Sequence, residues 1–136
     1  MSPSAVDTNV LIAALIREHE HHELALAPAA EATHVLGQVA VEAWSVLRRH
    51  FRLPSDLVET MLGRYRAPRT MLAPSVDAYE RALQRGAEAG LAGDIHDGVI
   101  VHTAAEAGLH LSTLDAGLHR LASGLVSCAL LSPVER

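Results

Sequence analysis

The 136-residue sequence contains no lysine, because all 11 of its basic residues are arginine. A P-loop needs a lysine at the bound phosphates, and Schiff-base catalysis needs a lysine amine. The sequence pattern of phospho-acceptor receiver domains also includes a lysine. The absence of lysine therefore argues against all three classes.

Cysteine and long apolar runs are also scarce. Cys128 stands alone, which excludes an internal disulfide and a cysteine-based zinc site. No apolar stretch approaches the roughly 18 residues of a membrane span, and no basic region precedes an apolar run near the start, as a signal peptide would require. We therefore expect a soluble, cytoplasmic protein that does not associate with membranes.

Aromatic residues are few: Trp44, Phe51, Tyr65 and Tyr79. With 49% hydrophobic residues in total, the core must be built mainly from alanine, valine, leucine and isoleucine. A chain of this length buries a substantial core but is short for two domains, so we expect one domain over residues 1–136.

Short apolar runs alternate with stretches of helical periodicity along the chain. The alternation predicts an α/β fold with a parallel sheet. The second helix is expected to end near Pro28, and Ser75 and Gly90 are expected to cap and to stop the fifth helix. The predicted strands cover residues 4–6, 33–37, 70–74, 109–115 and 125–132, and the predicted helices cover 9–17, 19–30, 38–51, 54–66, 76–91, 94–108 and 116–123.

Two acids follow predicted strands directly. Asp7 ends the first strand and Asp115 ends the fourth, and sites in open parallel sheets form outside the carboxyl ends of strands. Thr113 points to the same face as Asp115, so its hydroxyl could orient that carboxylate or a ligand. Both acids also have a plain alternative, since Asp7 could cap a helix and Asp115 could begin a turn.

Two further acids lie on apolar helix faces. Glu42 is on the flank of one apolar stripe, and Asp97 projects between Val101 and Ala104 on another. A carboxylate on a buried face costs several kcal/mol unless it is paired or binds a metal. An arginine could pair with each, but two inward acids and two strand-end acids together favour a shared cation. Asp94 more simply caps the helix that contains Asp97.

Basic and imidazole side chains offer weaker signals. The histidines at 19, 21 and 22 fit a solvated helix start better than a metal site, and those at 96, 102 and 119 could contact a substrate. The segment from residue 48 to residue 69 is rich in arginine, and its acids are Asp56 and Glu59. Its arginines could form a rim that holds a phosphate backbone, or could simply solvate two helix ends: Arg48, Arg49, Arg52, Arg64, Arg66 and Arg69.

Three segments together resemble a PIN domain, and more narrowly a VapC ribonuclease toxin: "VDTNVLIAAL", "VEAWSVLRR" and "IHDGVIVHTAAEAGLHLSTLDAGLHRL". The resemblance spans nearly the whole chain. It implies a three-layer α/β/α sandwich with a short parallel sheet, cleavage of RNA with Mg²⁺ or Mn²⁺, a homodimer, and inhibition by a cognate antitoxin. It matches the family's four acids to Asp7, Glu42, Asp97 and Asp115, and the supporting polar positions to Thr8 or Asn9 and to Thr113.

The hard oxygen ligands of this set suit Mg²⁺ or Mn²⁺ better than zinc, independently of the resemblance. One departure is His119, where the family often has an aromatic residue, and another is the additional acid Asp94. Two other functions stay open. A PIN-like domain could bind a partner without catalysis, or Asp7 could be the nucleophile of a phosphatase, although Asn9 occupies the position where such enzymes place a second aspartate.

Overall fold

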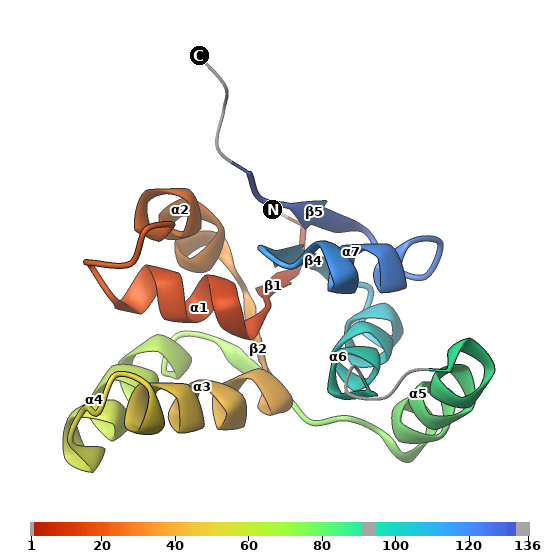
Figure 1. Ribbon diagram of the computed structural model, residues 1–136, viewed down its shortest axis with the longest axis horizontal. Helices are drawn as coiled ribbons and strands as arrows, with labels where there is room; N and C mark the ends of the chain where they lie inside the picture. The colour runs from red at the N-terminus through yellow and green to blue at the C-terminus, as the bar shows by residue number, and fades with distance from the viewer. Residues whose placement is uncertain (1, 91–94, 133–136) are drawn as a thin grey trace.

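The fold is described from a computed structural model, in which residues 2–90 and 95–132 are described. Within these ranges strands and helices alternate as the sequence predicted (Figure 1). The strands are β1 (Ser4–Val6), β2 (His34–Leu36), β3 (Thr70–Leu72), β4 (His110–Thr113) and β5 (Cys128–Leu130). The helices are α1 (Thr8–Leu15), α2 (His22–Glu31), α3 (Gly37–Arg49), α4 (Ser55–Arg66), α5 (Val76–Ala89), α6 (Ile95–Glu106) and α7 (Ala116–Ala122).

All paired strands are parallel. β4 lies between β1 and β5, and β2 pairs with β3. The backbone N–H of Thr33 donates to the carbonyl of Ser4 at 3.0 Å, which places β2 beside the edge of β1 that faces away from β4. The strands therefore follow the order β3-β2-β1-β4-β5 across the molecule.

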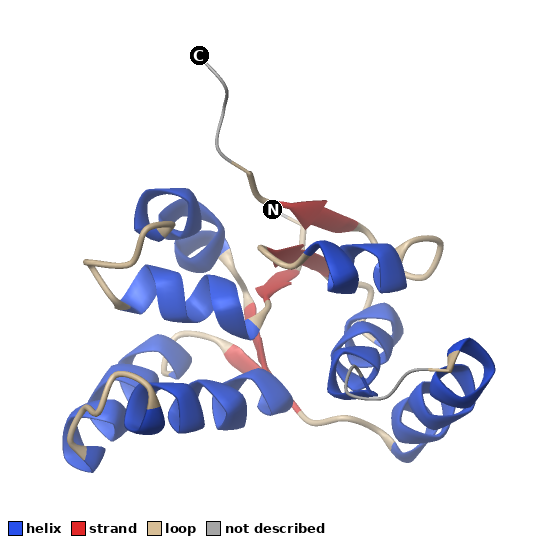
Figure 2. Cartoon of the chain, in the orientation of Figure 1, coloured by secondary structure: helices blue, strands red, loops and turns tan. Residues whose placement is uncertain are grey.

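Helices cover the strands on two sides. In Figure 1, α1 to α4 lie on one side of the central strands and α5 to α7 on the other. Figure 2 shows the strands in red between these two groups of blue helices. This arrangement confirms the predicted α/β fold with a parallel sheet between helical layers. In the part of the chain that the structure describes, no helix combines the length and apolar character needed to cross a bilayer.

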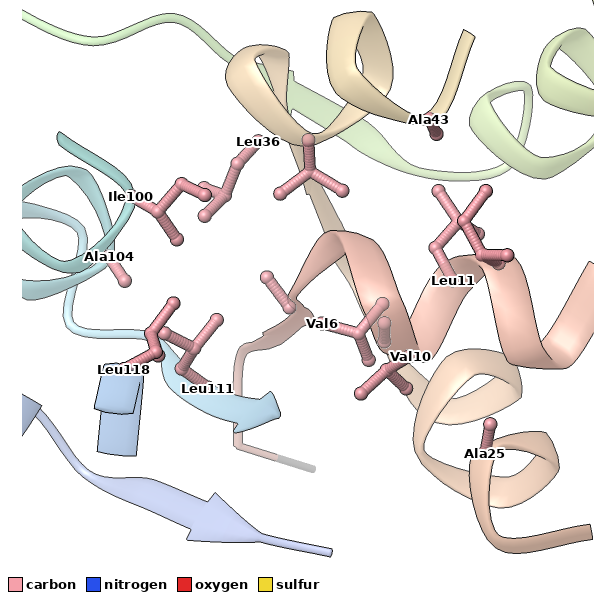
Figure 3. Packing of buried hydrophobic residues seen from close by; sticks show 14 of the residues in the cluster. Val6, Val10, Leu11, Ala25, Leu36, Ala43, Ile100, Ala104, Leu111 and Leu118 are labelled. Atoms are coloured by element: carbon pink, nitrogen blue, oxygen red, sulfur yellow. The ribbon is translucent and has the colours of Figure 1, made fainter. Parts of the chain in front are cut away.

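The core is aliphatic, as the scarcity of aromatic residues predicted. Leu11, Leu36, Ile100, Leu111 and Leu118 are completely or almost completely buried and come from both halves of the chain (Figure 3). Each such side chain contributes about 1.5–3 kcal/mol when it is fully removed from water. Trp44 and Tyr79 lie at the surface instead, 38% and 45% exposed.

Helix α5 begins and ends where the sequence predicted. The Ser75 side chain accepts a hydrogen bond from the N–H of Ala78 at 2.9 Å, and Gly90 follows the helix with φ +66°. This left-handed conformation is the usual end of a helix at glycine. Both signals were local, and both predictions are confirmed.

Helix α2 differs from the prediction at its start. It begins at His22 because residues 19–21 form turns, with the N–H of His22 bonded to the carbonyl of His19. It ends at Glu31, one residue beyond the predicted span of 19–30, so the predicted end near Pro28 is confirmed. Pro28 removes one backbone donor inside the helix.

Arg69 explains how the last turn of α2 is stabilised. Its guanidinium donates to the carbonyls of Ala29, Ala30 and Ala32 at 2.8–3.1 Å, and Tyr65 also donates its hydroxyl to Ala29. The same guanidinium lies 3.9 Å from the ring centre of Tyr65. The last carbonyl groups of a helix have no partner within the helix, and here Arg69, about 40 positions later in the sequence, donates hydrogen bonds to them. Arg69 supports the fold, so its predicted place on a phosphate-binding rim is withdrawn.

We predict that Arg69→Ala lowers the free energy of unfolding by about 2–3 kcal/mol, because several carbonyls lose a charged donor. Arg64→Ala is the matched control. Arg64 is an exposed arginine on the same helix as Tyr65, and its loss should cost less than about 0.5 kcal/mol. Urea unfolding followed by circular dichroism measures both. Equal losses in the two variants would contradict the assigned role of Arg69.

Candidate active site

The strand order reverses between β1 and β4. From β1 the chain proceeds outward through β2 to β3, whereas from β4 it proceeds the other way to β5. Such a reversal opens a crevice at the carboxyl ends of the two strands, where ligands bind in open α/β sheets. Asp7 follows β1 directly and Asp115 follows β4 after one residue, so both predicted strand-end acids lie at this crevice.

Asp7 is held on both carboxylate oxygens. It is only 5% exposed, its Oδ1 accepts the N–H of Thr8 at 2.7 Å, and its Oδ2 accepts the hydroxyl of Thr113 at 2.8 Å. The strand register brings these groups together, because Val6 pairs with Ser112 and the next residue along each strand is Asp7 or Thr113. Asp7 also caps α1, which was the plain alternative for this residue.

Thr113 acts on a different carboxylate from the one predicted. We expected its hydroxyl to orient Asp115 or a ligand. In the structure this fully buried hydroxyl donates to Asp7 and accepts the backbone N–H of Asp115 at 3.0 Å. The reason is the register of β1 and β4, which cannot be read from either strand alone. Thr113 therefore orients Asp7 by its side chain and Asp115 by its main chain.

Thr8 and Asn9 connect the start of α1 to the rest of the site. The Thr8 hydroxyl donates to Oε2 of Glu42 at 2.8 Å, and the Asn9 side-chain oxygen accepts the N–H of Leu114 at 3.2 Å. Gln38 contacts the other Glu42 oxygen at 3.4 Å from one turn earlier on α3. The half-buried Glu42 is therefore fixed against Asp7 through Thr8.

Asp97 and Asp115 are the more accessible acids. Asp97 lies in the first turn of α6 and is half-buried, whereas Val101 on the same helix is completely buried. Asp115 is exposed and caps α7, with its Oδ1 accepting the N–H groups of Gly117 and Leu118. Asp115 therefore does cap a helix start, as its alternative role suggested. Both capping hydrogen bonds go to Oδ1, and Oδ2 takes part in neither of them. Asp94 lies outside the described residues.

One pocket of about 440 Å³ joins the four acids. Asp7, Glu42, Asp97 and Asp115 all line it, although they come from four separate elements. In residues 2–90 and 95–132, no three histidine, cysteine, aspartate or glutamate side chains already stand grouped as a metal site. The remaining lining residues are Thr8, Asn9, Ile12, His19, Val46, His50 and Phe51.

The electrostatics of Asp7 reflect this crowding. Burial raises the pKa of its carboxyl above the ordinary value of 3.8, and the charges of Glu42 and Asp115 raise it further. The hydrogen bonds from Thr113 and Thr8 act in the opposite direction but do not cancel the effect of burial. Because the folded state holds this proton more readily than the unfolded chain, an ionised Asp7 lowers stability at neutral pH.

The pocket wall contains residues that we did not assign to the site. His50 and Phe51 line it beside Glu42 and Val46. The spacing of residues 42, 46 and 50 places them on one face of a helix, which is the signal that could have identified His50. His19 also lines the pocket, from the turns before α2, rather than beginning a solvated helix as predicted.

The predicted basic rim lies apart from this pocket. Among the described residues that line it there is no arginine. Arg48 donates to the carbonyl of Leu53, and Arg49, Arg52 and Arg64 are exposed. A second pocket, which shares Asp97 and Asp115 with the first, is instead lined by Arg85 and Arg120.

Comparison with known proteins identifies the family. The PIN domain model matches residues 5–124. Ribonuclease VapC27 of Mycobacterium tuberculosis is 33% identical over 119 residues, which cover 84% of this chain and 85% of the relative.

Solved structures show the same fold at lower identity. VapC20 of Mycobacterium tuberculosis, described as a sarcin–ricin loop cleaving toxin, matches with a TM-score of 0.68 and 16% identity over 89% of this chain and 95% of that one. The VapBC2 structure from Rickettsia felis, bound to a promoter DNA fragment, gives 0.67 and 15% identity over 93% and 97%. PAE2754 of Pyrobaculum aerophilum gives 0.64 and 19% identity over 93% and 90%. The fold, the family model and the 33% identical relative agree, and this chain belongs to the PIN-domain family, in its VapC group of ribonuclease toxins.

Proposed function

We propose that the chain is a metal-dependent endoribonuclease that hydrolyses RNA phosphodiester bonds, and that Asp7, Glu42, Asp97 and Asp115 are its site. The observation that carries the proposal is the convergence of four carboxylates, from four elements, on one pocket. Asp7 in particular is buried among like charges at a cost to stability, which a purely structural acid does not need.

The donor set fits Mg²⁺ or Mn²⁺. Both ions prefer carboxylate oxygens, and Mg²⁺ keeps several waters, so the acids need not all contact it directly. Asp7, Glu42, Asp97 and Asp115 would hold the ion or ions, directly or through water. When bound, such an ion supplies an activated water and stabilises charge on the phosphate oxygens during in-line displacement.

The protein groups around the acids would orient them for this task. Thr113 and Thr8 fix both oxygens of Asp7, and Thr8 also fixes one oxygen of Glu42. Asp115 uses Oδ1 to cap α7 and keeps Oδ2 for the pocket. Such supporting hydrogen bonds typically change metal affinity or activity by a factor of 10–100.

Two partners follow from the family. We propose that the chain is the toxin of a type II pair, that a cognate antitoxin places a basic segment in the acidic pocket, and that two copies associate as a homodimer. The acidic pocket and the net charge of −5 favour a basic inhibitor.

The alternatives account for fewer observations. A partner-binding domain without catalysis has no need for four costly acids around one pocket. A phosphatase would use Asp7 as a nucleophile, yet Asn9 occupies the position of the second aspartate of such enzymes and the chain has no lysine to assist.

We predict that Asp7→Asn raises the melting temperature of the metal-free protein at pH 7.5 and removes its stabilisation by Mn²⁺. The folded pKa of Asp7 is raised, so its charge costs stability at every pH above that value, and asparagine removes the cost. The wild-type protein should gain about 2.7 kcal/mol when Mn²⁺ is a hundred times its dissociation constant. Scanning calorimetry measures both effects.

Asp56→Asn is the control for this experiment, because Asp56 is an exposed acid on α4. It should respond to Mn²⁺ as the wild-type protein does. If Asp7→Asn keeps the full response to Mn²⁺, Asp7 is not a ligand.

We predict that Thr113→Val weakens Mn²⁺ binding about tenfold and destabilises the protein by about 1–3 kcal/mol, because a buried carboxylate oxygen loses its donor. Thr103→Val is a matched control. Thr103 is also buried and its hydroxyl bonds the Val99 carbonyl one turn back on α6, away from the acids. Isothermal titration with Mn²⁺ compares the two variants, and equal affinities would contradict the role of Thr113.

We predict that the purified protein, free of antitoxin, cleaves structured RNA in Mg²⁺ or Mn²⁺ and not in EDTA. Asp7→Asn and Asp97→Asn should each reduce the rate about 100-fold or more, because several kcal/mol of transition-state stabilisation depend on the ion. Asp56→Asn should cleave at the wild-type rate. Gel analysis of end-labelled RNA measures cleavage, and undiminished cleavage by both site variants would show that the acids are not the active site.

A further inference from the structure

A second pocket of about 340 Å³ shares a wall with the acidic pocket. Asp97 and Asp115 line both of them. The second pocket is also lined by Arg85 of α5 and Arg120 of α7. Two cations therefore line the same pocket as two of the proposed metal ligands.

Arg85 is held in place by the fold, and Arg120 lies beside the start of its own helix. Arg85 donates from Nη2 to the carbonyl of Leu121 at 3.3 Å, which ties α5 to α7. Arg120 extends back along its own helix toward Gly117, where a Cβ atom would stand 3.8 Å from its Nη2 and 3.1 Å from Oδ1 of Asp115. The missing side chain of Gly117 thus leaves room for a carboxylate and a guanidinium at the same helix start.

Neither guanidinium is neutralised by a described carboxylate. The ion pairs within residues 2–90 and 95–132 are His21–Glu20 and Arg81–Asp77. Arg81, one turn before Arg85 on α5, is thus already committed to Asp77 at 2.6 Å. Arg85 uses one N–H on the Leu121 carbonyl, and most of the donors of Arg85 and Arg120 are outside the hydrogen bonds of residues 2–90 and 95–132.

The ligand that this arrangement fits is a phosphate group. A guanidinium presents a planar fork of donors that matches phosphate oxygens, and two of them here face one pocket. Asp97 and Asp115 would repel a phosphate in the metal-free protein. Divalent ions on these acids would remove the repulsion, so phosphate should enter the pocket with the metal already bound.

We propose that Arg85 and Arg120 form a phosphate-binding subsite, which holds the RNA phosphate next to the scissile one along the strand. The proposal rests on the proposed ribonuclease function, because that function places the scissile phosphate at the four acids. It moves the basic surface that positions RNA from α3 and α4, where the sequence suggested it, to α5 and α7.

Binding and cleavage of a fluorescein-labelled single-stranded RNA in Mn²⁺ test the proposal. Arg85→Gln and Arg120→Gln should each raise the dissociation constant and KM about tenfold with little change in kcat, and each should reduce the slope of log Kd against log salt by about one. Arg120→Lys should recover part of the affinity, since it restores the charge without the fork. Fluorescence anisotropy and initial rates measure these quantities, and melting curves establish that each variant is folded.

Arg81→Gln is the matched control, since it removes an equal charge from the same helix at a residue that is already paired. It should change Kd less than twofold. An equal loss in Arg81→Gln would show a general charge effect and overturn the subsite, as would wild-type affinity in Arg85→Gln and Arg120→Gln. Anisotropy reports binding even when no cleavage follows. A protein that binds RNA through these arginines but does not cut it would therefore contradict the proposed function and leave the subsite standing.

Discussion

The hydrogen bond between the Thr113 hydroxyl and the Asp7 carboxylate is the contact on which the site depends. It joins the ends of β1 and β4, the two strands between which the sheet reverses its order. The same hydroxyl accepts the N–H of Asp115, and the residue after Asp7 holds Glu42. One buried threonine thus sets the positions of two acids directly and of a third through Thr8.

The four acids could be identified from the sequence because each breaks a local rule. Asp7 and Asp115 end apolar strands, while Glu42 and Asp97 interrupt apolar helix faces. The order of strands and helices was equally local, and so were the cap at Ser75 and the stop at Gly90. What failed were inferences that depend on distant partners. The Thr113 hydroxyl donates to Asp7 rather than to Asp115, because of the register of β1 and β4.

The location of positive charge shows the same limit. Six arginines cluster in the sequence between residues 48 and 69, yet clustering along the chain does not bring them to the acids. Arg85 and Arg120 are separated by 35 positions in the sequence and carry no local signal, but α5 and α7 both pack against α6, which brings the two arginines to one pocket. A cluster of arginines in the sequence therefore does not tell which arginines lie near the acids, because that depends on how the helices pack in the fold.

The sequence separation of Asp7 and Thr113 has a consequence for biosynthesis. The two residues lie 106 positions apart, and β1 cannot pair with β4 until the chain has been made beyond Thr113. Closing so long a loop also costs more entropy than forming any of the local helices. While the nascent chain is surrounded by ribosomal and messenger RNA, its acids are therefore still apart, and they come together only after residues 110–115 have been made.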